Sequence, residues 1–153
     1  MLIHSASQLL TLAGGPQRGA ELGRLGEIAD GALLIRGESI AEVGPSAELL
    51  RRYPDEPRLD ARGRAVLPGF VDPHTHLVWA GDRAAEFEMR LQGRTYMEIM
   101  AAGGGIASTV RATRAASRAE LLAQTRARAR AIFRAGTTTA EAKTGYGLEA
   151  ASE

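Results

Sequence analysis

The sequence contains no cysteine, which excludes disulfide bonds and thiolate metal ligands. Aromatic residues make up only 5% of it, and no apolar run approaches the roughly 18 residues that would span a bilayer. Neither charge dominates, because 19 basic and 18 acidic residues leave a net charge of +1. No overall field therefore favours nucleic acid or an anionic membrane as a partner. The first residues, MLIHSASQLL, lack the features of a secretory signal, so we expect a cytoplasmic protein.

Residues 1–66 are rich in short alternating segments and turns, which favours β-structure. Residues 33–35 and 40–43 predict a hairpin around a glycine-containing turn. SAELLRRY, at 46–53, predicts a short helix, and RLDARGRAVLPG predicts two short strands around Gly63. This region is too small for a complete β-sandwich.

In residues 67–153 the spacing of apolar residues changes and predicts helices alternating with strands. FVDPHTHLVW predicts a buried strand, and AAEFEMRLQG and TYMEIMAAGG have helical spacing. Ser117 and Glu120 form a capping-box pattern, followed by an apolar stripe and then by Gly136 as the terminating residue. TTTAEAK predicts another strand, and a further helix is expected to begin at Leu148. This order of strand, helix and strand favours a parallel sheet.

His74 and His76 lie two residues apart at the end of the first of these strands. Alternate side chains of a strand share a face, so both imidazoles can bind one metal ion. The alternative is two partly exposed histidines in a loop. The preceding apolar run favours the metal site, and Asp72 is close enough in sequence to accept the N–H of a metal-binding imidazole and so orient its ring.

The stretch LPGFVDPHTHL resembles the metal-binding signature of the amidohydrolase superfamily, whose members are TIM-barrel hydrolases and deaminases. AGDRAAEFEMRLQGRTYMEIMAAGGGIASTVRATR and GTTTAEAKTGYGLE are similar to the imidazolonepropionase family within it. The resemblance covers essentially the whole chain and implies an α/β fold. Residues 1–66 would be part of a small β-rich, sandwich-like composite domain, and 67–153 the first two or so units of a (β/α)8 barrel. Such a barrel takes about 250 residues, so it is expected to be incomplete in this chain.

The resemblance implies hydrolysis of the cyclic amide of 4-imidazolone-5-propanoate to N-formimidoyl-L-glutamate, in histidine degradation. One zinc or iron ion is the implied cofactor, with His74 and His76 among its ligands. No catalytic residue is expected within the chain, because the family's glutamate base and remaining ligands would lie beyond Glu153. We therefore expect this chain alone to be inactive.

Three residues match, or lie near, positions that contact substrate in this family. Arg83 corresponds to a guanidinium that grips the substrate, and its planar fork suits a carboxylate. Tyr146, between two glycines, matches a second such position, and Tyr96 is a third candidate. From the residues alone, Arg83 would be an ordinary solvated arginine of a polar loop, and helical packing explains Tyr96 equally well.

Several other interpretations stay open. The chain is either part of such an enzyme or a non-catalytic remnant, and within the enzyme class another cyclic amide or amidine is the alternative substrate. The partners expected are a small-molecule substrate, with no nucleic acid and no membrane, and a homo-oligomer is left open. AAGGGI lacks the phosphate-binding GxxxxGK[ST] pattern. Lys143 is expected to have a structural role or to support a metal ligand, and His4 to be an ordinary surface or packing residue.

Overall fold

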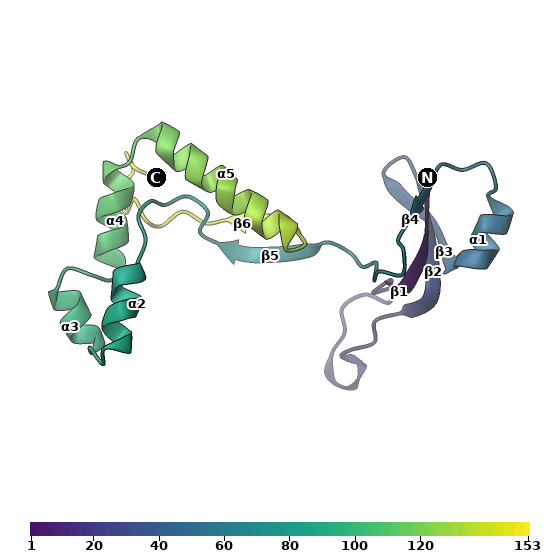
Figure 1. Cartoon of the computed structure of the whole chain (residues 1–153), viewed down its shortest axis with the longest axis horizontal. Coiled ribbons are helices and arrows are strands. Elements are labelled where there is room, and N and C mark those ends of the chain that lie inside the picture. The colour runs from purple at the N-terminus through teal and green to yellow at the C-terminus, as the bar shows by residue number, and fades with distance from the viewer. The chain divides into compact units, whose positions relative to one another are not determined.

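A computed structural model describes residues 1–153, which form two compact units, Met1–Pro68 and Gly69–Glu153 (Figure 1). The sequence predicts a domain boundary between residues 66 and 67. No helix in either unit is long and apolar enough to cross a membrane.

The first unit is a four-stranded sheet in the order β3-β2-β1-β4. β1 pairs antiparallel with β2 and parallel with β4, and β2 and β3 form the predicted hairpin. The predicted helix at 46–53 is confirmed as α1. Of the two short strands expected around Gly63 only β4 forms, and Val66 contributes a single bridge to Leu9. The elements are β1 (Leu2–Leu10), a 3₁₀ turn η1 (Gly19–Glu21), β2 (Glu27–Arg36), β3 (Ser39–Pro45), α1 (Ser46–Arg52) and β4 (Arg58–Asp60).

Side-chain alternation along β2 divides the core of this unit between the two faces of the sheet. Leu34 belongs to one buried cluster, which α1 covers through Leu49, and Leu33 belongs to the other. The hydroxyl of Ser46 ties α1 to the sheet, since it donates to the Gly31 carbonyl at 3.0 Å and accepts the Ser5 N–H at 2.9 Å. The alternating pattern in the sequence therefore specifies this unit.

The second unit contains a two-stranded parallel sheet, β5 with β6, which confirms the predicted parallel pairing. Four helices connect the strands, and α5 packs against β6 (Figure 1). Capping boxes start α3 at Thr95 and α5 at Ser117, and Gly136, at φ +102°, follows α5 as predicted. The elements are β5 (Phe70–Thr75), α2 (Ala84–Leu91), α3 (Tyr96–Ala101), α4 (Ile106–Ala115), α5 (Arg118–Arg134) and β6 (Thr137–Ala142).

Two predictions for this unit were wrong. The strand expected at 70–79 ends at Thr75 and is not buried, since Phe70 is 53% and Val71 67% exposed. A parallel strand is buried when elements cover both its faces, and a sheet of two strands leaves much of this surface open. No helix begins at Leu148, whose φ of +54° is left-handed and incompatible with a helical start.

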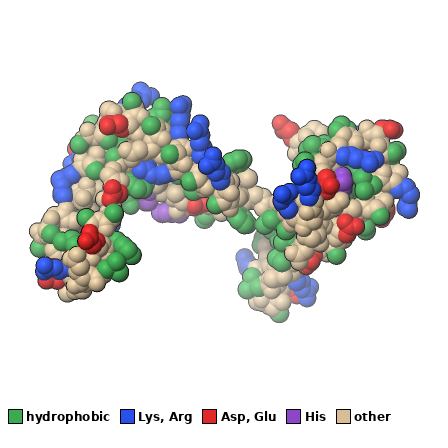
Figure 2. All heavy atoms as spheres, viewed as in Figure 1, with side chains coloured by type: hydrophobic (Ala, Val, Ile, Leu, Met, Phe, Trp, Pro, Cys, Tyr) green, Lys and Arg blue, Asp and Glu red, His purple; other side chains and the backbone are tan.

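Basic side chains follow the exposed side of α5 (Figure 2). They are the solvated face of a helix whose partly buried residues include Leu121, Thr125 and Ile132. Capped at both ends, α5 is long enough to run beside the sheet and reach the loop that follows β5.

Candidate functional site

His74 lies within β5 and His76 lies one residue beyond its end. Their ring centroids are 5.6 Å apart and the rings meet edge to face at 73°. The two imidazoles therefore approach one another, as alternate positions on a strand require. The Nδ1 atom of His76 is buried and has no hydrogen-bond partner. Such a nitrogen is available to an external ligand, because buried polar atoms are otherwise paired.

Asp72 holds the backbone of this segment. Its carboxylate accepts the His74 backbone N–H at 3.0 Å and the Thr75 hydroxyl, and these two bonds, the hydroxyl first, lower its pKa. The sequence suggested that Asp72 accepts an imidazole N–H. The Asp72 carboxylate instead accepts the Thr75 hydroxyl and the His74 backbone N–H, which forms a local turn. Aspartate favours such turns because its short side chain reaches the backbone N–H two residues on.

The loop after β5 is fixed by α5. The indole N–H of Trp79 donates to the His76 carbonyl at 3.0 Å, and the guanidinium of Arg128 lies 3.5 Å from the Trp79 ring centroid. Arg128 also donates to the Leu77 carbonyl at 2.9 Å, and Thr125 donates to the same oxygen at 3.3 Å. Partial burial lowers the pKa of Arg128. The stacking of Arg128 on Trp79 and these hydrogen bonds fix the backbone of His76 and Leu77 against α5.

Tyr146 lies beside the histidines, with its ring centroid 4.9 Å from that of His76. The neighbouring Gly145, at φ +142°, leaves no room for a side chain, because an added Cβ would lie 2.9 Å from Cε1 of His76. The loop between β6 and the following turns thus packs its backbone directly onto the imidazole.

A single carboxylate organises that loop. Glu153 accepts the backbone N–H groups of Gly145, Gly147 and Leu148 at 3.0, 2.9 and 2.8 Å. The Leu148 bond is the largest cause of its lowered pKa. These bonds account for the left-handed turn that replaced the predicted helix. Arg114, in the last turn of α4, adds a bond to the Gly147 carbonyl at 2.7 Å.

Replacing Glu153 by alanine should release this loop. At neutral pH we expect amide exchange in residues 144–148 to become about tenfold faster, because three backbone N–H groups of the loop lose their bonds to a charged acceptor. The lowered pKa adds a pH signature. Protection in the unchanged chain should be complete above pH 4.5, the ordinary value for this carboxyl, and lost as the pH falls through its lower folded value.

Hydrogen-exchange mass spectrometry, corrected for the intrinsic pH dependence of exchange, measures both effects. Glu88→Ala is the matched control, since that exposed carboxylate accepts only the Gln92 amide and contacts no group of the loop. Equal exchange in Glu153→Ala and the unchanged chain would contradict this role.

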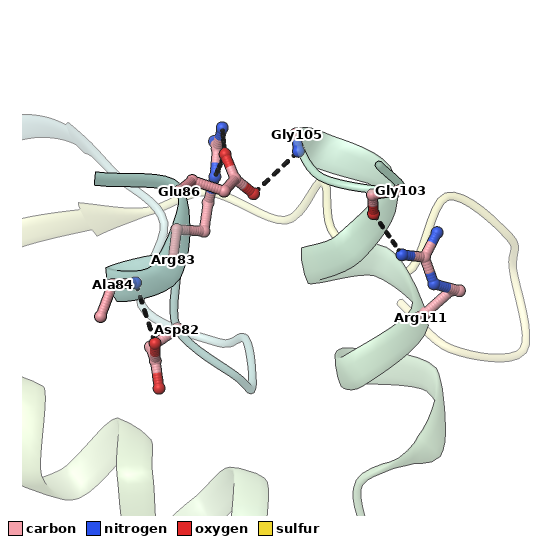
Figure 3. Close-up of polar contacts among 7 residues, drawn as sticks. All are labelled: Asp82, Arg83, Ala84, Glu86, Gly103, Gly105 and Arg111. Carbon is pink, nitrogen blue, oxygen red and sulfur yellow. Dashed lines mark hydrogen bonds and ion pairs between the residues drawn. The ribbon is translucent and has the colours of Figure 1, made fainter. Parts of the chain in front are cut away.

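Arg83 immediately precedes α2 and forms an ion pair with Glu86 in the first turn of that helix (Figure 3). Its Nε and Nη2 atoms both donate to Oε2 of Glu86, at 2.8 and 2.5 Å. The pKa of Arg83 is raised first by Glu86 and, more weakly, by the nearby phenols of Tyr146 and Tyr96. Both tyrosines thus lie close enough to Arg83 to act on its charge, and the Tyr96 residue is 60% exposed.

Four contributors to this site escaped sequence reasoning: Glu86, Trp79, Arg128 and Glu153. Glu86 had a local signal, since an acidic residue three positions after an arginine, in the first turn of a helix, is placed to pair with it. Trp79 and Arg128 contact one another but lie about 50 residues apart in sequence, so no local pattern links them.

Two imidazoles with a free buried nitrogen fit part of a metal site, because neutral imidazole is a common ligand of zinc and iron. No group of three or more His, Asp or Glu side chains in the chain is placed to hold a metal. Lys143 pairs with Glu141, and its backbone N–H donates to the Thr75 carbonyl at 2.9 Å.

Comparison with known proteins places the chain in a family. Residues 31–55 match the model of an imidazolonepropionase-like composite domain of bacteria, and residues 59–132 match that of the amidohydrolase family. The imidazolonepropionases of Chloroflexus aggregans and Symbiobacterium thermophilum are each 56% identical over the whole chain. That of Deinococcus radiodurans is 55% identical over 94% of it.

The chain spans 36%, 37% and 35% of the length of these three relatives. At this identity along its entire length, it belongs to the imidazolonepropionase family of amidohydrolases.

Proposed function

We propose that this chain is part of an imidazolonepropionase that hydrolyses 4-imidazolone-5-propanoate to N-formimidoyl-L-glutamate. The observation that carries the proposal is the convergence of His74, His76 and Tyr146 in one cluster, with Arg83 near the same tyrosine. In the reaction, water adds across the amide C–N bond of the ring. Its oxygen bonds to the carbonyl carbon, that C–N bond breaks, and a proton goes to the departing nitrogen.

His74 and His76 would hold one zinc or iron ion in this proposal. When bound, such an ion lowers the pKa of a coordinated water toward about 7 and polarises a carbonyl oxygen. We infer that the remaining ligands and the proton-transferring glutamate belong to the part of the protein that this chain does not span. In the same proposal, β5 and β6 are the first two strands of a (β/α)8 barrel, and the histidines lie at the carboxyl end of the first, where such barrels build their sites.

Arg83 would bind the propanoate group of the substrate. Its guanidinium side chain is 42% exposed and has N–H groups that Glu86 does not use. Tyr146 would line the ring-binding side, because it already contacts His76. Tyr96 would approach the carboxylate from α3, where its high exposure leaves its hydroxyl accessible.

The function is tested in a chimaera in which residues 1–153 replace the matching segment of the Chloroflexus aggregans enzyme. We expect metal-dependent ring opening, followed as loss of the imidazolone absorbance. Arg83→Ala should raise KM roughly thirtyfold with a smaller change in kcat, because a charge-assisted bond to a carboxylate contributes about 2 kcal/mol. Arg94→Ala, an exposed arginine that pairs only with Glu98, is the control.

The alternatives predict different results. An amidohydrolase specific for another cyclic amide or amidine would turn over that compound and leave imidazolone propanoate intact. A non-catalytic remnant would give a folded chimaera without turnover of either. An unchanged KM in Arg83→Ala would show that Arg83 does not bind the carboxylate.

A further inference from the structure

Glu86 is a buried carboxylate for which the proposed reaction has no direct use. The residue is 8% exposed and lies in the first turn of α2. Its Oε2 accepts both the Nε and the Nη2 of Arg83, whereas its Oε1 accepts the Gly105 backbone N–H at 2.8 Å (Figure 3). Burying a carboxylate is costly unless it is paired and hydrogen-bonded. Here both oxygens are satisfied, and the bonds from Arg83 are the main cause of its lowered pKa.

The Gly103–Gly105 segment, which matched no phosphate-binding pattern, makes room for this carboxylate. An added Cβ at Gly104 would lie 3.1 Å from the carboxyl carbon of Glu86 and 2.9 Å from the Ile99 carbonyl oxygen. Gly105, at φ +74°, has a left-handed conformation that turns its N–H toward Glu86 at the start of α4. Arg111 of α4 also holds this segment, since its guanidinium donates to the Gly103 carbonyl at 2.5 Å.

The contact determines which edge of Arg83 is available. A guanidinium offers two edges suited to a carboxylate, one formed by Nε with one terminal nitrogen and one by the two terminal nitrogens. Glu86 occupies the first, so Nη1 and the outer hydrogen of Nη2 form the remaining edge. A long, half-exposed arginine would otherwise sample many rotamers, and fixing it in advance removes much of the entropy cost of binding.

We propose that Glu86 is the positioning residue for Arg83, which it holds by the Nε edge so that the Nη1–Nη2 edge is presented to the carboxylate of the substrate. This inference rests on the proposed function for the identity of the substrate. Glu86 acts through Arg83 and does not touch the reacting atoms. Gly104 contributes by leaving room for the carboxylate and Gly105 by donating its N–H to it, so that Glu86 links Arg83 to the backbone at the start of α4.

The test uses the same full-length chimaera and two small probes, propanoate and its uncharged analogue propanamide, titrated by ligand-observed NMR. In Glu86→Gln, which is nearly the same size and keeps an acceptor for Gly105, propanoate affinity should fall about tenfold. Propanamide affinity should not change. Glu88→Gln is the matched control, since Glu88 lies on the same helix, is exposed and contacts only Gln92.

Combining Glu86→Gln with Arg83→Ala separates positioning from general destabilisation. The double variant should bind propanoate no more weakly than Arg83→Ala alone, because Glu86 has no effect without its arginine. In turnover assays Glu86→Gln should raise KM about tenfold and leave kcat within about twofold.

Equal or tighter propanoate binding in Glu86→Gln would overturn the inference, since it would mean that Glu86 merely neutralises the arginine. Failure of the unchanged chimaera to prefer propanoate over propanamide would overturn it as well. The titration requires no turnover. A chimaera that shows the tenfold fall and yet opens no imidazolone ring would refute the proposed function and support the positioning role.

Discussion

The 153-residue chain, purified alone, will not open the imidazolone ring, with or without added zinc or iron. Its two histidines approach one another, but no third His, Asp or Glu completes a metal-binding group with them. Catalytic zinc sites use three protein ligands together with an open position, so a two-histidine site leaves most of the coordination to water and binds weakly. The proposed mechanism also needs a proton-transferring group, which no residue of this cluster supplies.

The exposed surface of the second unit adds to this expectation. β5 and β6 form a parallel pair with apolar residues open to solvent, and such edges and faces promote association between chains. We therefore expect size-exclusion chromatography to show oligomers or aggregates of the isolated chain. The assay is the imidazolone absorbance under metal-loaded and chelator-treated conditions. Metal-dependent turnover by the chain alone would refute the prediction and require that self-association supply the missing ligands.

Replacing His76 by alanine in the chimaera should abolish ring opening and lower metal affinity by more than about a hundredfold. Removing a residue that only supports a metal ligand typically costs ten- to a hundredfold, so removing a ligand itself should exceed that. His76 is the more informative of the two histidines, because its Nδ1 is buried and unpaired and because both Tyr146 and Gly145 pack on its ring.

Metal content by elemental analysis and turnover should be measured together. His4→Ala is the control, since His4 lies in β1 of the first unit and its ring nitrogen contacts the Ser5 hydroxyl. A His76→Ala chimaera that keeps its metal and loses activity would assign the histidine to substrate contact. One that retains both would end the proposal that this residue is a ligand.

Local chemistry explains which features the sequence predicted. The capping box at Ser117, the glycine after α5 and the hairpin of β2 and β3 depend on neighbouring residues, so pattern alone identified them. The approach of His74 and His76 followed from strand geometry. Their metal-binding role remains a proposal.

Longer-range contacts explain the failures. In place of the helix expected at Leu148, the chain turns back so that the carboxylate of Glu153 accepts the N–H groups of Gly145, Gly147 and Leu148. The buried character of β5 depends on covering elements, which a strand's own sequence does not supply. Arg83 was recognised from its motif, but the carboxylate that orients it was not, because the burial of Glu86 depends on glycines that lie nearly 20 residues downstream.

α4 carries a geometric constraint that follows from what it holds at its two ends. The N–H of Gly105, just before it, is bound to the Glu86 that grips Arg83, and Arg114, in its last turn, is bound to the loop of Tyr146. Near its end Thr113 also accepts the Ala80 N–H, in the segment after the histidines. One residue added to a helix moves everything beyond it by about 1.5 Å and turns it by about 100°. The ten residues of α4 therefore set the spacing between the contacts that hold Arg83 and those that hold the loop of Tyr146, and the length of α4 is far less free to vary than that of the loops around it.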